Sequence, residues 1–275
     1  PGRPDVIALP PEDIMPQDGE AKQDCEQQAG KRWLSKHAQA VAPHQMTILG
    51  DDRYSKQPFW ALAQPQGLHC ILTCKPASHP KFSERLAFWQ ANDGMAAWEG
   101  RCWNGRFTAV TLYRYVNDVL LRGGAGALSG NWFEITVVKT KTGEQRYHNS
   151  FITNHRLSAA NIAAVAQAGR GRWKIENENN NVLKTKGYHL EHNVGHGQQS
   201  LSAFLLSLTL LAFLCHTVLE WSDDKYALLR RVLARRQTFF EDIRALTRYM
   251  VFDSWDHLMD FMIRGLDLQP QIDTG

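Results

Sequence analysis

Two short apolar runs, Met46–Gly50 and His69–Cys74, constrain the fold of this chain most. Each has the length and composition of a buried β-strand. A helical pattern precedes each of them: Glu20–Ala40 is rich in Ala, Gln, Glu and Lys, and Ser55 with Pro58 is placed to cap and begin a second helix. The order helix, strand, helix, strand is typical of an α/β sheet.

Two carboxylates, Asp51 and Asp52, follow the first apolar run directly. Open α/β sheets carry their functional sites at the carboxyl ends of strands, so both side chains are candidates for such a site. Asp51 is preferred, and Asp52 stays open because a register shift of one residue would exchange the two. The ordinary alternative for either residue is a turn or a helix cap.

The segment from Trp98 to Phe151 is richer in Thr, Val, Tyr, Trp and Gly than the chain before it. This composition favours a β-rich block with a hairpin turn at Thr142–Gly143. Three tryptophans, Trp98, Trp103 and Trp132, are expected to be buried in that sheet, and stacking on an unpaired base is the alternative. The strands are expected at Gly105–Val116, Trp132–Lys139 and Gln145–Ile152.

The stretch Gly171–Lys184 carries the strongest chemical pattern. On an α-helix, four-residue spacing stacks four polar residues along one face, with a slow drift around the axis: Arg172, Glu176, Asn180 and Lys184. A carboxylate flanked by cations suits a metal-assisted phosphoryl-transfer site, since the carboxylate binds the metal ion and the cations bind phosphate oxygens. Ordinary ion pairs on a solvated helix are the alternative.

Two further features of this helix follow from the same spacing. Glu178 lies about 200° round the helix from Glu176 and therefore cannot share its face. Apolar residues beside the polar set are expected to anchor the helix: Trp173, Ile175, Val182 and Leu183.

The overall charge neither demands nor excludes a nucleic-acid partner. The net charge is +3 and the pI is ≈ 8.6, so any DNA surface must come from local clusters of Lys and Arg. A hydrophobic fraction of 43% is enough for a globular core. The five cysteines include no Cys-x-x-Cys pair, which favours free thiols in a reducing cytoplasm.

The run Leu201–Leu219 is nearly uncharged and, at about twenty residues, long enough to raise a membrane helix as an alternative. Polar residues within it favour a helix buried among other helices instead, among them Ser202, Ser207, Thr209 and His216. The tail from Lys225 onward combines Leu and aromatic residues with several Arg residues, and is predicted to be helical and to lie on the surface.

A group of imidazoles, His189, His192 and His196, lies close in sequence to Glu191. Histidine is a common zinc ligand, so a zinc site is one interpretation. Because no Cys joins the group and glycines flank it, the preferred interpretation is a loop that hydrogen-bonds the neighbouring helix or a DNA backbone.

The string Arg172-Trp-Lys-Ile-Glu176, followed by Leu183-Lys184, resembles the glutamate-bearing helix of DDE transposases from bacterial insertion sequences. The pattern of that family is Arg-Trp-x-Ile-Glu and then a Lys two turns on. The resemblance continues through Gly187–Gly197 and, upstream, through Thr47–Ser55 and Ile71–His79. One departure is that seven residues separate Glu176 from Lys184, where the common pattern has six.

The resemblance implies an α/β fold with a ribonuclease-H-like catalytic core, interrupted by a β-rich insertion and followed by C-terminal helices. The implied segments are a Pro-rich leader at 1–17, the first part of the core at 18–97, the insertion at 98–153, the rest of the core with the Glu176 helix at 154–220, and a C-terminal helical segment at 221–275.

The resemblance also implies the chemistry. Asp51 and Glu176 would be catalytic carboxylates and ligands of two Mg²⁺ or Mn²⁺ ions. Arg172 and Lys184 would hold DNA phosphates without reading base sequence. The expected function is metal-dependent cleavage and strand transfer of double-stranded DNA by a cytoplasmic protein that does not enter a membrane and that forms a homodimer in its active complex.

Transposases of this family use three carboxylates, of which the first Asp precedes the strand that ends in the second. The acids upstream of Asp51 are Asp5, Asp13, Asp18 and Asp24, together with glutamates, and none of these four follows a strand-like run. The chain also begins at Pro1 without Met, so we expect an N-terminally incomplete chain that is inactive alone. Two alternatives stay open: a non-catalytic DNA-binding remnant of a transposase, and a membrane-associated protein that uses Leu201–Leu219.

Overall fold

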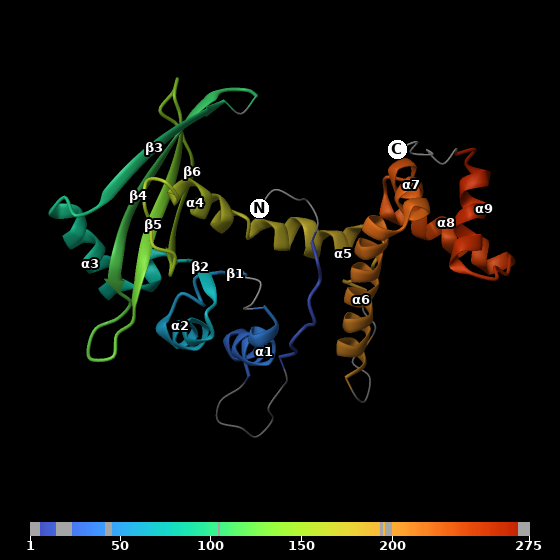
Figure 1. Cartoon of the computed structure of the whole chain (residues 1–275), viewed down its shortest axis with the longest axis horizontal. Coiled ribbons are helices and arrows are strands. Elements are labelled where there is room, and N and C mark those ends of the chain that lie inside the picture. Colours follow the sequence, from blue (N-terminus) through green and yellow to red (C-terminus); the bar gives the residue numbers. More distant parts are fainter. Residues whose placement is uncertain are drawn as a thin grey trace. The chain divides into compact units, whose positions relative to one another are not determined.

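The computed structural model describes residues 6–14, 24–41, 46–103, 105–192, 195 and 200–268 (Figure 1). These residues form two compact units. Unit 1 runs from Glu12 to Arg172, and unit 2 combines residues 6–11 with the residues from Trp173 onward. Each unit has hydrophobic clusters of its own.

One six-stranded mixed sheet forms the centre of unit 1. Its strand order is β1-β2-β6-β5-β4-β3, in which β1 and β2 are parallel and every other neighbouring pair is antiparallel. Strands of the predicted core and of the predicted β-rich block therefore share a single sheet, with β1 at one edge. The strands are β1 (Thr47–Gly50), β2 (His69–Thr73), β3 (Ala96–Trp103), β4 (Thr108–Leu120), β5 (Ser129–Lys139) and β6 (Gln145–Thr153).

Helices pack on both faces of this sheet, which confirms the predicted α/β class. The first face is covered by α1 (Glu26–Val41), α2 (Gln57–Ala63) and α3 (Pro80–Ala91), and the second by α4 (Ile162–Arg170) (Figure 1). Successive side chains of a strand point to opposite faces, so Cys70 and Leu72 lie in the first cluster and Ile71 in the second. Two short 3₁₀ turns, η2 (Gln64–Gln66) and η3 (Pro76–Ser78), complete the connections around β2.

The approach of α4 to the sheet depends on Gly169. A Cβ atom added to this buried glycine would lie 2.9 Å from Cγ2 of Ile71 and 3.3 Å from the ring of Phe151. The first of these distances is shorter than ordinary carbon contacts allow. A glycine is therefore what lets α4 lie against β2 and β6.

Most of the predicted elements of unit 1 are found, with small shifts at their ends. The hairpin turn is confirmed, because Gly143 has a φ of +67° and its N–H donates to the carbonyl oxygen of Lys139 at 2.9 Å. The long strand β3 was not predicted as a strand of its own. The capping role predicted for Ser55 is wrong, since Lys56 is the N-cap residue of α2 and makes no side-chain capping bond.

Unit 2 is helical. Its helices are a π-helix, η4 (Ile175–Asn180), and the α-helices α5 (Asn181–Thr185), α6 (Leu201–Ser222), α7 (Asp224–Val232), α8 (Arg236–Tyr249) and α9 (Trp255–Gly265). The prediction of a helical tail is confirmed. The prediction that it lies on the surface is wrong, because α7, α8 and α9 build a core around Tyr226, Phe239 and Met259, each 0% exposed.

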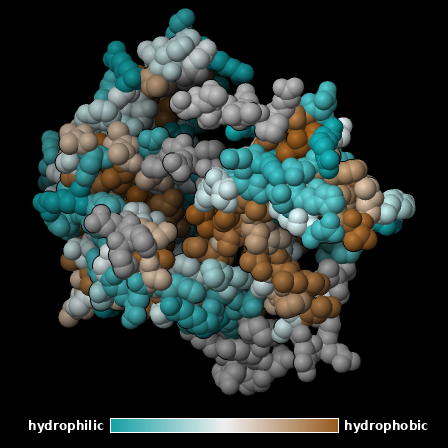
Figure 2. Space-filling view, turned by 45° about the vertical axis from the view of Figure 1, so that its right-hand side comes forward, coloured by the Kyte–Doolittle hydropathy of each residue, from teal (hydrophilic) through white to brown (hydrophobic). Residues whose placement is uncertain are grey.

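Helix α6 departs from the expectation of a helix buried among others. Phe213 and Thr217 are buried, but Phe204 is 60% exposed and Leu211 is 54% exposed, and hydrophobic side chains also reach the surface in the space-filling view (Figure 2). Among the described residues, α6 is the one helix that is long and apolar enough to cross a membrane, with a mean hydropathy of 2.0. Helix α6 meets this criterion by its length and composition. It also packs against the amphipathic helix α7 of the same unit.

Candidate functional site

The carboxyl ends of β1 and β2 carry polar side chains, as predicted. Asp51 directly follows β1 and is half-buried. Its Oδ1 atom accepts a hydrogen bond from the backbone N–H of Arg53 at 2.8 Å, and its carbonyl oxygen accepts one from the N–H of Tyr54 at 3.2 Å. This turn fixes the Asp51 carboxylate at the end of the parallel strand pair.

Asp52 has a different environment. Its Oδ1 atom accepts a hydrogen bond from the backbone N–H of Lys75 at 2.6 Å and lies 3.4 Å from Nε2 of His79. Lys75 follows β2, so Asp52 joins the ends of the two parallel strands. This structural role supports Asp51 over Asp52 as the candidate metal ligand.

The side chains of Ser55, His79 and Asp52 meet at the same place without forming a hydrolase triad. Both Oγ of Ser55, at 2.8 Å, and Oδ1 of Asp52, at 3.4 Å, approach Nε2 of His79. In a triad the serine and the aspartate bind opposite nitrogens of the imidazole. The Ser55 hydroxyl, which is buried, also donates to the carbonyl oxygen of Asp52 at 2.7 Å, so this cluster stabilises the turn after β1. No sequence pattern indicated this cluster.

The upstream acids that the structure describes serve other contacts. Both carboxylate oxygens of Asp24 bind the guanidinium of Arg32 at 2.8 Å, and the Asp24 side chain is only 2% exposed. Glu12 binds Arg32 at 2.8 Å and Lys36 at 2.7 Å, and hydrogen bonds from Lys36 and Arg32 lower the pKa of this carboxyl. Asp13 is exposed and lies in no strand, while Asp5 and Asp18 lie outside the described residues.

The Glu176 helix contains a π-helical turn that the sequence did not predict. The backbone N–H of Asn181 donates to the carbonyl oxygen of Glu176, which is a step of five residues in place of the four of an α-helix. Asn180 therefore falls slightly short of one full turn from Glu176, where an α-helix would carry it slightly past one, so it stays near the same face. Lys184 follows Asn181 by three residues in α5, which returns it to the face of Glu176.

The charged residues of this helix differ in their surroundings. Glu176 is exposed, whereas Glu178 is half-buried and pairs with Lys174 at 3.5 Å. Lys184 pairs with Glu191 in the following turn, with 2.8 Å between Nζ and Oε1. Arg172 is the last residue of unit 1 and is half-buried.

Of the apolar residues predicted to anchor the helix, some are buried and others are exposed. Leu183 is 1% exposed and packs with Phe213 and Ala8, and Val182 lies beside this cluster. Trp173 and Ile175 are 49% and 46% exposed, so the prediction that they anchor the helix is wrong. Along the chain, Glu176 thus follows two exposed apolar residues and precedes an exposed cation, Lys184.

Asp51 belongs to unit 1 and Glu176 to unit 2. Both side chains are carboxylates, and carboxylate oxygens are ligands that Mg²⁺ prefers. Within the part of the chain that the structure describes, no group of three or more His, Cys, Asp or Glu side chains comes close enough to hold a metal ion. For the imidazoles considered as zinc ligands, this covers His189 and His192, while His196 lies outside the described residues.

The three tryptophans of the β-rich block differ in how far they are buried. Trp132 is 4% exposed and lies in the first-face cluster, as predicted. Trp98 and Trp103 in β3 are 37% and 62% exposed, so burial is the wrong prediction for these two. Trp98 rests against Tyr113 with ring centroids 5.3 Å apart.

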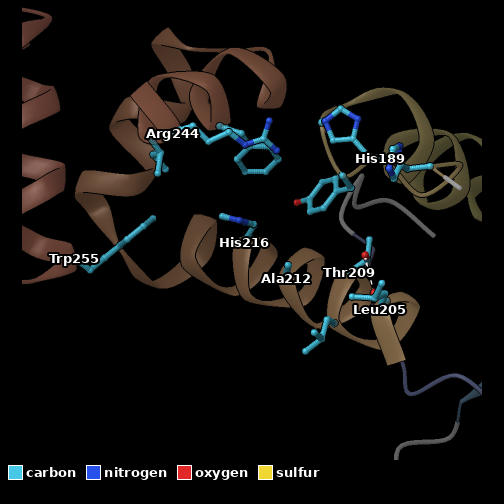
Figure 3. A pocket seen from close by; sticks show the side chains of 13 residues that line it. His189, Leu205, Thr209, Ala212, His216, Arg244 and Trp255 are labelled. Atoms are coloured by element: carbon cyan, nitrogen blue, oxygen red, sulfur yellow. Dashed lines mark hydrogen bonds between the residues drawn. The ribbon is translucent and has the colours of Figure 1, made fainter. Parts of the chain in front are cut away.

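Unit 2 contains a pocket of ≈ 810 Å³ that the sequence did not indicate (Figure 3). It lies between α6, the helices α8 and α9, and the turn that follows α5. Its lining comes from residues far apart in sequence: Gly187, Tyr188, His189, His192, Leu205, Leu208, Thr209, Ala212, His216, Phe240, Ile243, Arg244 and Trp255.

No model of a known protein family matches this chain, and no curated protein matches it.

Proposed function

We propose that this protein is a DDE transposase that cleaves and joins double-stranded DNA with divalent metal ions. The observation that carries the proposal is the π-helical turn at Ile175–Asn180. It holds one additional residue within the interval from Glu176 to Lys184, in which the chain has one residue more than the family pattern, and it thereby keeps Lys184 on the face of Glu176. If the resemblance were due to chance, there would be no reason for the extra residue and the π-helical turn that accommodates it to occur in the same interval.

The order of elements in unit 1 supports a ribonuclease-H-like core. A carboxylate follows the first of two parallel strands, and a β-rich block separates it in sequence from the Glu176 helix, in the order that the resemblance implies. The block extends the same sheet through the pairing of β6 with β2. The strands of segments 18–97 and 98–153 would then form one continuous sheet.

In the proposed mechanism, Asp51 and Glu176 would bind Mg²⁺ or Mn²⁺, held as two ions. Metal ions in such a site activate a water molecule or a 3′ hydroxyl and stabilise the leaving oxygen of an in-line displacement. Arg172 and Lys184 hold the phosphates of the strand that is cut. The exposed residues Trp173 and Ile175 offer apolar surface beside Glu176 for the deoxyribose and base edges of that strand.

Replacement of Glu176 tests this assignment. In the full-length protein, Glu176→Gln should abolish metal-dependent cleavage of DNA that carries the element ends, while affinity for the same DNA stays within about twofold, because the variant keeps the shape and loses the ligand charge. Glu178→Gln is the matched control, since Glu178 is the partner of Lys174, and it should retain most of the activity.

Two results contradict the proposal. Equal loss of cleavage in both variants would show that the assigned helix face is wrong. DNA binding by the unmodified protein without any cleavage dependent on Mg²⁺ or Mn²⁺ would favour the alternative, a non-catalytic DNA-binding protein in which the same cations bind phosphate.

A further inference from the structure

The pocket in unit 2 has preformed aromatic walls. The rings of Tyr188 and Phe240 lie with centroids 5.1 Å apart, and those of His216 and Phe240 lie 4.8 Å apart. Figure 3 shows His216 on α6, His189 on the turn after α5, and Trp255 at the opposite side of the pocket. Flat aromatic surfaces of this kind stack on other flat rings.

Hydrogen bonds from outside the pocket fix these walls. The Tyr188 hydroxyl accepts a hydrogen bond from Nη1 of Arg236 at 2.9 Å. Nδ1 of His216 lies 2.9 Å from the Tyr226 hydroxyl, so the other ring nitrogen, Nε2, remains for a polar group in the pocket. Because these contacts exist without a ligand, little side-chain ordering opposes binding.

The charges around the pocket favour an anion. Arg244 is exposed and lines one side, and the exposed imidazoles of His189 and His192 line the turn after α5. Among the 13 lining residues that the structure describes, none is Asp or Glu. Burial and the cations Arg236 and Arg230 lower the pKa of His216 to about 4, so the floor of the pocket is uncharged at neutral pH. An anionic ligand with a flat, apolar body fits both features.

We propose that this pocket binds one unstacked nucleotide of single-stranded DNA. The base stacks on the aromatic side chains Tyr188, Phe240 and Trp255, and its phosphates bind Arg244 together with His189 and His192. The inference rests on the proposed function, because a protein that cuts and joins DNA meets strands with unpaired ends. It adds a site for DNA in unit 2 that is separate from the residues assigned to strand cleavage.

A photo-crosslinking experiment locates the base. The full protein is mixed with a short oligothymidylate that carries 5-iododeoxyuridine, irradiated, and digested for mass spectrometry. Crosslinks to Tyr188, Phe240 or Trp255 are expected. Crosslinks confined to other residues, such as Trp98 or Trp103 of β3, would place the unpaired base elsewhere and overturn the proposal.

Binding measurements separate the base from the phosphates. A fluorescein-labelled oligothymidylate should bind at least about fivefold more tightly than an abasic strand with the same number of phosphates, since stacking contributes this much per base. Trp255→Ala should remove most of that difference, and Trp255→Phe should restore it. Arg244→Gln should weaken both strands alike, while Arg248→Gln, on an exposed residue of α8 outside the lining, should change little.

Two outcomes of these measurements contradict the inference. Equal binding of the normal and abasic strands would show that no base enters the pocket. Binding of a long-chain carboxylate such as decanoate, lost in Arg244→Gln, together with no binding of the oligothymidylate, would assign the pocket to an apolar acid. The inference and the proposed function fail separately, because Glu176→Gln should leave oligothymidylate binding unchanged and Arg244→Gln should leave metal-dependent cleavage detectable.

Discussion

The backbone N–H of Asn181 donates to the carbonyl oxygen of Glu176, five residues before it. This π-helical bond widens one turn of the helix and moves every later side chain back by about one residue position. On an uninterrupted α-helix, the drift of the four-residue spacing would leave Lys184 about 80° round the axis from Glu176. The π-helical turn removes most of that drift, so the two residues lie on one face two turns apart. π-helical turns occur often at functional sites, and this one lies beside the candidate catalytic carboxylate.

Changing the length of the π-helical turn tests this geometry. Deletion of Asn180 should let the segment close as an α-helix and keep Lys184 on the face of Glu176, so that DNA cleavage by the full-length protein survives. Insertion of one Ala after Asn180 should rotate Lys184 by about 100° and should weaken DNA binding as much as Lys184→Ala does. Loss of function in the deletion and full function in the insertion would contradict the proposed role of the turn.

The second prediction concerns phosphate binding by Arg172 and Lys184. Arg172→Ala and Lys184→Ala should each weaken binding similarly for unrelated DNA sequences, and each should reduce the slope of log K against log salt by about 0.9, because phosphate contacts release counterions. Titrations of two duplexes of different sequence over a range of salt concentrations measure both effects. A loss restricted to one sequence would make these side chains base readers.

If Lys184 binds DNA as proposed, Glu191 would compete with the phosphates for it. The two side chains form a largely exposed ion pair at 2.8 Å, and such pairs contribute about 0–1 kcal/mol. Glu191→Gln should therefore tighten DNA binding by up to about fivefold, with no effect in a Lys184→Ala background. The same gain in both backgrounds would show that Glu191 acts through general charge and not through Lys184.

The fourth prediction concerns the stability of unit 1. Gly169→Ala should destabilise the protein by about 1–3 kcal/mol, since the added methyl group overlaps Ile71 and crowds Phe151 in a packed interface. Urea denaturation measures the change. Gly123→Ala is the control in the same unit, because a Cβ atom at Gly123 meets no atom within 4 Å, and it should change stability by less than about 0.5 kcal/mol.

Acid should destabilise unit 2 through His216. Burial lowers the pKa of this imidazole from 6.5 to about 4 in the folded protein, so between these values the unfolded chain binds a proton that the folded protein does not. Stability contributed by neutral His216 is thus present above about pH 6.5 and is lost progressively down to about pH 4. His216→Phe should be less stable at pH 7, through loss of the bond to Tyr226, and should lose less stability than the unmodified protein between pH 7 and pH 4.5. Equal losses in the two proteins would contradict the assignment.

The apolar runs and turn residues of the sequence determined the positions of β1 and β2, the hairpin at Gly143 and the start of α6 at Leu201. These features depend on periodicity and backbone preferences within a few residues, so the sequence alone carries them. Asp51 and Glu176 were also identified from sequence, through their place after a strand and within a family pattern, and their catalytic roles stay predictions.

Tertiary structure decided which polar and apolar groups meet. The bond of Asp52 to Lys75 depends on the parallel pairing of β1 with β2, and no spacing along the chain expresses that contact. Trp132 is buried because it lies on the sheet face that helices cover. Trp103 is exposed because it lies in β3, the edge strand at the other side of the sheet from β1. The pocket joins Tyr188, His216 and Trp255 from three separate segments, and only the folding of α6, α8 and α9 around a shared core brings such distant residues together.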